Sequence, residues 1–558
     1  MTDETTLLLE RHFDTAFAAP DGIKKLRKLI LTLAMRGELV LQNPADETAE
    51  HLLKQNQKLI VKAMEGKRKA LPKLNEKKVK IPLGWVRCHL ADVALVVMGN
   101  SPPGNTYNDN GDGVPLINGP VEFSRDAFGP TLKTKYTTAP SRLCTKNDLL
   151  VCVRGATTGR TNIAAFDACI GRGVALVRGW TAQQYLNYLL WHLGQQLLEQ
   201  GKGTTFPSIS YADLAGLEIL LPPFAEQRRI VTKIDQLMAR CDELEKLRDD
   251  RNQKRLTVHT AALNRLLNAP EGQPFDDAWT FITQNFSELY SVKENVAELR
   301  KAILQLAVMG KLVPQDPNDP PASELLDAIA LEKQRLVKEK KSKKQKPVQK
   351  QVSSEIGSQI PEGWIHTCLD ELFLVSGGIQ KTPKRTPVMN HHPYIGVANV
   401  QRGRLELHEV KRFELIEGEL EKWALQTGDI MVVEGNGSAE EVGRCAIWKG
   451  EIEKCVHQNH LIKCRPLHQK ISDYILMLLN SPIGMHEMKR LAVTTSGLYN
   501  LSVSKIRGIN LLLPPLPEQQ RIVTKVNRLM SLCDVLEEKI DGSSKQKQTL
   551  LNTVMAQV

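Results

Sequence analysis

Polar and basic side chains gather in glycine-rich loops in two well-separated stretches of this chain. Arginine can read guanine, asparagine and glutamine can read adenine, and threonine, serine and backbone amides can hold phosphates. For a single residue an ordinary surface loop is the better interpretation, whereas the whole set favours contact with a nucleic acid. The candidate DNA-binding residues of the first stretch are Arg154, Thr157, Thr158, Arg160, Arg172, Lys202, Thr204 and Thr205. Those of the second stretch are Lys381, Lys384, Arg385, Asn436, Ser438, Arg444, Gln458, Asn459, His460, Ser496, Tyr499 and Asn500.

The sequence contains no complete motif for catalysis or metal binding. Residues 99–106 have the glycine spacing of a phosphate-binding loop, but Asn105 stands where that loop needs a lysine. Cysteines and histidines between residues 455 and 464 could suggest zinc, but their spacing is poor, and the equivalent stretch 169–174 lacks the histidines. We therefore predict no catalytic residue, no metal site and no cofactor bound by this chain itself.

The chain is basic, and its positive charge favours a polyanionic partner. The net charge is +11 and the pI about 9.0, which is a weak indication by itself. No apolar run reaches the roughly 18–20 residues of a membrane span, and the acidic N-terminus does not resemble a signal peptide. Ten cysteines without a CxxC pair indicate buried thiols in a reduced, cytoplasmic chain.

Three motifs occur twice and in the same order. Residues 26–40 return at 299–313, 81–85 at 360–364, and 221–233 at 513–525. The copies lie much further apart than the roughly 20–50 residues of a solenoid unit, so they indicate tandem duplication of a whole module. The loops that hold the candidate contact residues differ most between the halves. A shared scaffold with two different reading surfaces would produce this pattern.

The sequence of each half predicts four structural elements, which follow in the same order in both halves. An amphipathic helix (23–35 and 296–309) ends at a glycine and is followed by a basic stretch (58–80 and 333–350). The basic stretches are either solvated connectors or phosphate-contacting arms. Short apolar, β-branched runs then predict a compact mixed domain, and a Pro-Pro pair begins a long helix with a glutamate in its first turn.

The long helices carry a coiled-coil seam, because their apolar residues recur in alternating steps of four and three. About forty residues make a rod of roughly 60 Å. The predicted seam residues are Ile230, Ile234, Leu237, Leu244, Ile522, Val526, Leu529 and Leu536.

The predicted fold class is α+β, with two α/β domains separated by long antiparallel coiled-coil helices and an internal pseudo-two-fold tandem duplication. The predicted parts are a helical region with a basic linker (1–80), a first α/β domain (81–220), a central helical region (221–359), a second α/β domain (360–512) and a C-terminal spacer helix (513–558).

The helix start Leu-Pro-Pro-x-x-Glu-Gln-x-x-Ile-Val occurs twice, each time after a variable domain opened by Ile-Pro-x-Gly-Trp. This arrangement resembles the specificity subunit of type I restriction–modification enzymes, over nearly the whole chain. The helix that precedes the first variable domain is similar to the type IB subfamily.

The resemblance implies that each mixed region is a target recognition domain reading one half of a split site in double-stranded DNA. The long helices would set the gap, and helical regions near 23–40 and 296–313 would dock two modification subunits. Those subunits would carry S-adenosylmethionine and methylate adenine at N6. Two restriction subunits would add cleavage of DNA with ATP and Mg²⁺, so this chain would supply no chemistry.

Other functions stay open at this point. An orphan specificity or scaffold protein would bind DNA or a methyltransferase without a restriction partner, and partners lie on other chains. An enzyme acting on a phosphorylated substrate would need a nucleophile, a base or a metal site. A coiled-coil scaffold without a DNA role would show no salt-dependent DNA affinity.

Overall fold

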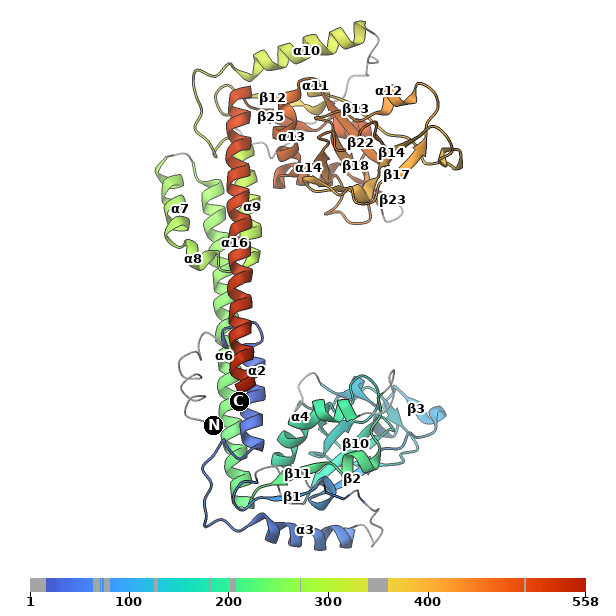
Figure 1. Cartoon of the computed structure of the whole chain (residues 1–558), viewed down its shortest axis with the longest axis vertical. Helices are drawn as coiled ribbons and strands as arrows, with labels where there is room; N and C mark the ends of the chain where they lie inside the picture. The colour runs from blue at the N-terminus through green and yellow to red at the C-terminus, as the bar shows by residue number, and fades with distance from the viewer. Residues whose placement is uncertain are drawn as a thin grey trace. The chain divides into compact units, whose positions relative to one another are not determined.

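The computed structural model describes residues 17–63, 71, 73–74, 81–124, 129–180, 182–200, 207–270, 272–339, 360–495 and 498–557 (Figure 1). The chain divides into two compact units. Unit 1 comprises Met1–Arg251 with Ser543–Val558, and unit 2 comprises Asn252–Gly542. Each unit therefore contains one α/β domain, and each also contains the C-terminal part of the long helix that begins in the other half.

The first α/β domain is closed by pairing of its first and last strands. Strand β1 (Val86–His89) pairs antiparallel with β11 (Glu218–Leu221), so Val86 lies opposite Leu221. A four-stranded antiparallel sheet has the order β2-β10-β7-β8, and a second sheet has the order β3-β5-β4-β9-β6. The remaining strands are β2 (Ala94–Met98), β3 (Tyr107–Asn108), β4 (Val114–Ile117), β5 (Tyr136–Thr137), β6 (Leu143–Cys144), β7 (Leu149–Cys152), β8 (Thr161–Ile163), β9 (Ala168–Ile170) and β10 (Val174–Gly179); the helices are α4 (Gln183–Gln200) and α5 (Tyr211–Ala215).

The second α/β domain repeats the closing strand pair and the four-stranded sheet. Strand β12 (Ile365–Cys368) pairs with β25 (Asn510–Leu513), and the four-stranded sheet has the order β13-β22-β18-β20. Its other sheets have the orders β17-β14-β21, β15-β16 and β19-β24-β23. The strands are β13 (Phe373–Ser376), β14 (His391–Ile395), β15 (Val400–Gln401), β16 (Arg404–Leu405), β17 (Lys411–Glu414), β18 (Ile430–Val433), β19 (Gly435–Asn436), β20 (Cys445–Ile447), β21 (Val456–His457), β22 (Leu461–Pro466), β23 (Val493–Thr495) and β24 (Leu498–Asn500); the helices are α11 (Leu369–Leu372), α12 (Glu419–Trp423), α13 (Ser472–Asn480), α14 (Pro482–Leu491) and α15 (Val503–Arg507).

The cores of the two domains explain why the apolar runs form strands. Every residue of β7 and β18 is buried, as a continuous apolar run predicts for a strand covered on both faces. One ion pair with a buried aspartate recurs beside these strands, Arg178 with Asp148 in the first domain and Arg465 with Asp429 in the second. A guanidinium that binds both carboxylate oxygens fixes the end of each central strand against its neighbour.

The amphipathic helices form close to the predicted limits, as α2 (Gly22–Met35) and α9 (Lys293–Val308). Gly37 and Gly310 adopt φ angles of +73° and +76°, which side chains other than glycine rarely allow. The residue after each glycine donates its N–H five residues back, Glu38 to Leu33 and Lys311 to Leu306. This is the Schellman arrangement, which supplies partners for the last carbonyls of the helix.

The long helices α6 (Phe224–Asn268) and α16 (Leu516–Gln557) begin directly after the Pro-Pro pairs, as predicted. In unit 2, Lys293 pairs with Asp541 and Arg300 with Asp534, so α9 runs antiparallel to α16. The tail of α6 runs parallel to α9, because His259 contacts Tyr290 and Leu267 accepts a hydrogen bond from Lys311. The tail of α6 is therefore antiparallel to the start of α16.

Unit 1 contains the corresponding contacts. Arg27 of α2 pairs with Asp242 and Glu245 of α6. Leu551 of α16 packs in an apolar cluster with Phe17 and Leu29. In both units, the amphipathic helix (α2 or α9) thus lies between the start of its own long helix and the end of the other. We call α2 and α9 the docking helices, after the role that the resemblance implies for them.

Some of the predicted coiled-coil seam residues pack into the apolar cores of the two units. Ile230 and Ile234 belong to the apolar core that α2 shares with the first α/β domain, and Ile522 and Val526 belong to the corresponding core of unit 2. Leu244 is 45% exposed. Pairing of the two long helices through all eight predicted seam residues stays a prediction.

All three repeated motifs meet at one place in each unit, which we call the motif junction. In unit 1, the indole Nε1 of Trp85 donates to Oε2 of Glu226 at 3.0 Å, and Trp364 donates to Glu518 at 2.9 Å in unit 2. A Cβ on Gly37 would lie 2.9 Å from Pro82 Cγ and 3.1 Å from the Trp85 ring. The helix end, the tryptophan and the start of the long helix are therefore in direct contact.

The glutamates of the junction are almost fully buried, at 1% exposure each. Burial raises the pKa of Glu226 and of Glu518 above the ordinary value, and the tryptophan hydrogen bonds oppose this shift. Each carboxyl also lies in the first turn of a long helix, where the helix dipole favours negative charge. The junction thus fixes the start of each long helix by a specific polar contact.

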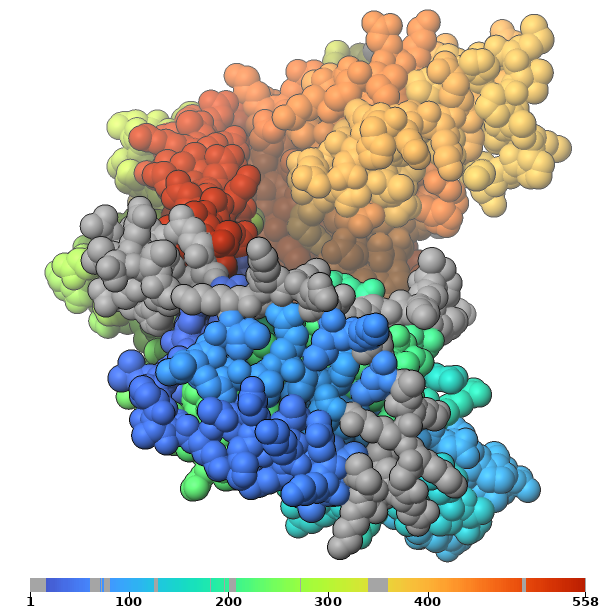
Figure 2. Space-filling view, turned by 60° about the horizontal axis from the view of Figure 1, so that its bottom comes forward, coloured from blue at the N-terminus to red at the C-terminus, as the bar shows by residue number. Residues whose placement is uncertain are grey.

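Each predicted basic stretch begins within a helix that packs against an α/β domain. Helix α3 (Ala49–Ala63) packs beside the start of the first domain, and Figure 2 shows residues of the two segments, in dark and lighter blue, side by side on the surface. Helix α10 (Ala322–Lys338) has the equivalent place in unit 2. Most of the predicted basic stretches, 64–70, 75–80 and 340–350, lie outside the described residues.

Further features of the chain agree with its composition. All ten cysteines are buried free thiols, as predicted. No helix in the part of the chain that the structure describes is long and apolar enough to cross a membrane. Helices α7 (Gln273–Gln284) and α8 (Phe286–Leu289) connect α6 with α9 in unit 2.

Removing the indole donor tests the motif junction. We expect Trp85→Phe to lower the stability of the folded chain by about 1–3 kcal/mol, because the buried carboxyl of Glu226 loses its hydrogen-bond partner. Thermal unfolding of the full chain measures this effect. Trp279→Phe is the matched control, since Trp279 is 45% exposed on α7 and lies outside the junction. Equal destabilisation by both changes would contradict the importance of the junction.

Candidate nucleic-acid interface

A short loop between β9 and β10 displays Arg172 on a fixed backbone. The N–H of Gly171 donates to Ile117, and the N–H of Val153 donates to Gly173, both at 2.9 Å. A Cβ on Gly171 would lie 2.0 Å from the side-chain oxygen of Asn118. The loop therefore requires glycine on one side of Arg172 at least, and its backbone is held by neighbouring strands.

Arg172 shares a hollow with a second arginine. A hollow of about 540 Å³ is lined by Arg154 and Arg172 together with Asn118, Gly155 and Ser208. Arg154 follows β7, and its backbone bridges to Ser208. Both arginines are exposed, and among the described residues neither guanidinium has an ion-pair or hydrogen-bond partner. This part of the surface offers two unneutralised donor groups on a rigid support.

The second α/β domain holds the corresponding loop, between β21 and β22, with the same backbone hydrogen bonds. Four N–H to carbonyl bonds recur at equivalent positions of the two sheets. In the first domain they are Gly171 to Ile117, Asn100 to Ile170, Val153 to Gly173 and Ile209 to Val153; in the second they are Gln458 to Ile395, Ile379 to His457, Glu434 to His460 and Leu501 to Glu434. The loops therefore correspond residue by residue, and Asn459 stands at the position of Arg172.

The side chains on the second loop differ from those on the first. Gln458 and His460 replace the two glycines, and the position of Arg154 is taken by Gly435. His460 lies 3.8 Å from Glu434, whose pKa is raised by burial. Burial also lowers the pKa of His457 to about 3, so its ring is neutral at pH 7. The second loop is thus mainly an amide surface with little net charge.

Comparison with known proteins assigns the two α/β domains to one family. Residues 82–251 and 361–542 both match the model of the type I restriction modification DNA specificity domain. The chain belongs to this family. Its two α/β domains are two copies of the specificity domain on one chain, which agrees with the duplication seen in the sequence.

Relatives in this family match over most of the chain. The specificity subunit of the type I restriction enzyme EcoEI from Escherichia coli is 28% identical, over 96% of this chain and 93% of the relative. The EcoAI specificity subunit from the same organism is 29% identical, over 94% and 92%. The crystal structure of the HsdS subunit from Thermoanaerobacter tengcongensis is 30% identical with a TM-score of 0.28, and the match covers 36% of this chain and about half (47%) of that one.

Several of the predicted contact residues of this specificity protein have partners within the chain. Thr158 donates to the carbonyls of Gly155 and Pro207, and Arg160 donates to the carbonyl of Ser124. In the second domain Arg385 pairs with Glu419, Arg444 with Glu441, and Asn436 accepts from the N–H of Ser438. These bonds stabilise loops, and a role for the same residues in DNA contact stays a prediction.

The other predicted residues divide by exposure. Lys381 and Lys384 are exposed and follow Ile379, whose backbone is hydrogen-bonded to His457 and Asn459. Thr157, Tyr499 and Asn500 are half-buried. Tyr499 and Asn500 lie on β24, which pairs with β19 beside Asn436. Lys202, Thr204, Thr205 and Ser496 lie outside the described residues.

Two residues of the hollow escaped the sequence analysis. Asn118 and Ser208 lie far from Arg172 in the chain, and only the sheet brings the three together. The segment 117–120 (Ile-Asn-Gly-Pro) after an apolar run was the available signal, since Asn-Gly-Pro is typical of a loop at a strand end. Among the described residues no group of three His, Cys, Asp or Glu side chains could hold a metal ion.

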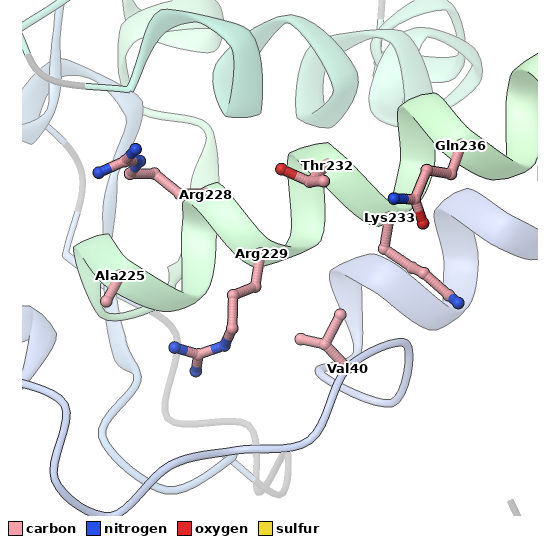
Figure 3. A pocket seen from close by; sticks show the side chains of 7 residues that line it. All are labelled: Val40, Ala225, Arg228, Arg229, Thr232, Lys233 and Gln236. Carbon is pink, nitrogen blue, oxygen red and sulfur yellow. The ribbon is translucent and has the colours of Figure 1, made fainter.

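A second basic hollow lies at the start of α6, beside the motif junction. Its volume is about 470 Å³, and it is lined by Val40, Ala225, Arg228, Arg229, Thr232, Lys233 and Gln236. Figure 3 shows Arg229 and Lys233 leaving the helix on the side of Val40. Arg229 is bound by both oxygens of Asp46, as Arg521 is by Asp319. Thr232 and Lys233 are exposed and recur as Thr524 and Lys525, which are exposed too.

Gly99 lies so close to the backbone of the Arg172 loop that it allows a test of how firmly this loop is held. A Cβ on Gly99 would lie 2.3 Å from the carbonyl oxygen of Gly171 and 2.6 Å from that of Val174. We expect Gly99→Ala to destabilise the first domain by about 1–3 kcal/mol through overpacking and to displace the loop. Thermal unfolding and DNA binding by the assembled complex measure both effects.

The matched control is Gly104→Ala, because nothing lies within 4 Å of a Cβ at Gly104. If the two substitutions gave the same stability and the same DNA affinity, the rigid support of Arg172 would be disproved.

Proposed function

We propose that this chain supplies the DNA sequence specificity of a type I restriction–modification complex, each α/β domain reading one half of a bipartite target. The observation that carries the proposal is the set of four backbone hydrogen bonds that recurs around one loop of each domain, which we call the loop clamp. It presents Arg172 in one domain and Asn459 in the other on the same backbone. A duplicated scaffold with different reading side chains is what an asymmetric split site requires. The net charge of +11 favours association with the phosphate backbone.

The long helices would act as the spacer between the two half-sites. Each docking helix contacts the start of one long helix and the end of the other, and these contacts would fix the register of an antiparallel pair. Half-sites about one helical turn apart, near 34 Å, lie on one face of the duplex and can be read together. In this proposal the seam residues determine the gap and take no part in reading bases.

The partners would be two modification subunits, two restriction subunits and double-stranded DNA. Adenine-N6 methylation with S-adenosylmethionine, and cleavage with ATP and Mg²⁺, would belong to those other subunits, while this chain is non-catalytic and binds none of these cofactors. The helix before the first domain supports membership of the type IB subfamily. A complex of this kind would act in the cytoplasm, where host DNA lies.

Repeated, exposed residues support the docking of two identical subunits. Thr232 with Lys233, and Thr524 with Lys525, take no part in the described apolar cores, yet they are the same in both halves. They lie beside the motif junction, where α2 or α9 ends. We assign this basic hollow to the modification subunit, since one partner used twice requires the same surface twice.

Methylation mapping tests the proposed function. A host without DNA methylation would carry the modification subunit from the same system, with and without this chain. Long-read sequencing should show an adenine-methylated split motif only when this chain is present. An assembled complex that leaves the genome unmethylated would refute the proposal.

Charge reversal tests the docking surface. Lys233→Glu should weaken one of two modification-subunit sites by about tenfold or more, because a negative charge would replace a positive one on the surface assigned to that subunit. Adding Lys525→Glu should weaken both. Native mass spectrometry would read the change as loss of one and then of two subunits. The control pair is Lys246→Glu with Lys539→Glu, exposed on the same helices outside the hollow; equal loss in this pair would contradict the assignment.

A further inference from the structure

The equivalent loops of the two domains differ in chemistry at one well-defined position. Arg172 and Asn459 have the same backbone environment, because four hydrogen bonds around them recur in both domains. The hollow beside Arg172 contains a second arginine, whereas Gly435 stands at the equivalent place in the second domain. One backbone site therefore presents a cationic fork in one half and an amide in the other.

We propose that Arg172 reads a guanine in the half-site bound by the first domain, and that Asn459 reads an adenine in the half-site bound by the second. This inference rests on the proposed function, because it assumes that each domain faces one half of a split DNA target. It goes further by naming the residue and the base at one position of each half-site.

The guanidinium of Arg172 matches the major-groove edge of guanine, because guanine is the only base that presents two acceptors and no donor there. In the major groove guanine presents two acceptors, N7 and O6, which match the two parallel N–H groups of one guanidinium. Adenine and cytosine present an amino donor, which would face a second guanidinium at Arg154. Among the described residues the lining contains no carboxylate that could accept from such a donor.

Arg172 is also prepared for this contact before DNA binds. Its own N–H donates to the hydroxyl of Ser101 at 3.2 Å, and the glycines on both sides have no room for a side chain. The backbone is thus fixed while the exposed guanidinium has no described partner inside the chain. A side chain on a rigid support loses less freedom on binding, which favours specific contact.

Asn459 carries the chemistry that adenine requires. Its amide offers one acceptor and one donor group, which match the N6 amino group and N7 of adenine. Its backbone N–H donates to Ile379 at 2.9 Å, so the loop is as firmly held as that of Arg172. The neighbouring Gln458 presents a second amide on the same loop.

A phosphate contact is the competing role for Arg172, and it predicts a different result. Losing a phosphate contact weakens binding to all sequences about equally, whereas losing a base contact relaxes the choice at one position. The distribution of bases at each methylated position therefore separates the two roles.

The experiment compares Arg172→Ala with Asn459→Ala in the complete complex, by methylation mapping and by competition between duplexes that differ at one base pair of the mapped target. We expect Arg172→Ala to reduce the preference for guanine at one position about 5- to 100-fold and to leave the other half-site unchanged. Asn459→Ala should relax an adenine position in the opposite half-site only. Arg172→Lys should keep the charge and lose most of the preference.

The matched control is Arg142→Ala, because Arg142 is an exposed arginine of the same domain that does not line the hollow. Uniformly weaker binding to all duplexes, or a first half-site whose bases stay unchanged in Arg172→Ala, would overturn the inference while leaving the split motif intact. Absence of any split motif with the unmodified chain would instead refute the proposed function.

Discussion

A buried hydrogen bond from tryptophan to glutamate connects every repeated part of this chain. In each half the indole of the Ile-Pro-x-Gly-Trp motif donates to the glutamate of the Leu-Pro-Pro-x-x-Glu motif, 3.0 Å away in unit 1 and 2.9 Å away in unit 2. The glycine that ends the docking helix packs against the same tryptophan. Because both partners are almost fully buried, loss of either leaves an unsatisfied polar group, and this cost fixes where the α/β domain joins its helices.

From this junction the first and last strands of each α/β domain run as an antiparallel pair, so the domain begins and ends at the same place. The sheets beyond it then carry loops at equivalent positions. Because the clamp around Arg172 and Asn459 consists of backbone hydrogen bonds, the displayed side chain can change without changing the support. A scaffold of this kind can alter what it reads while it keeps its fold.

The helices show a second consequence of duplication. Leu551 at the end of α16 packs with Phe17 and Leu29 of the first half, whereas His259 near the end of α6 contacts Tyr290 at the start of the second docking region. Each unit is thus completed by a helix end that begins in the other half. Neither docking helix would bury its apolar stripe fully without both copies of the module, which gives a physical reason for two copies on one chain.

The duplication, the approximate limits of α2 and α9, the Pro-Pro starts of the long helices and the buried strands β7 and β18 could all be predicted from the sequence. They depend on periodicity and on the local chemistry of glycine and proline. The sequence also predicted Arg154, Arg172 and Asn459 as contact residues, among a longer set of loop residues. The three-dimensional fold was needed to show that Arg154 and Arg172 share a hollow with Asn118, while Arg160 and Arg385 are bound within the chain. It likewise showed that Ile230 and Ile234 contribute to the core shared with α2. Such relations depend on strand pairing and helix packing between residues far apart in the chain, which no local pattern of residues encodes.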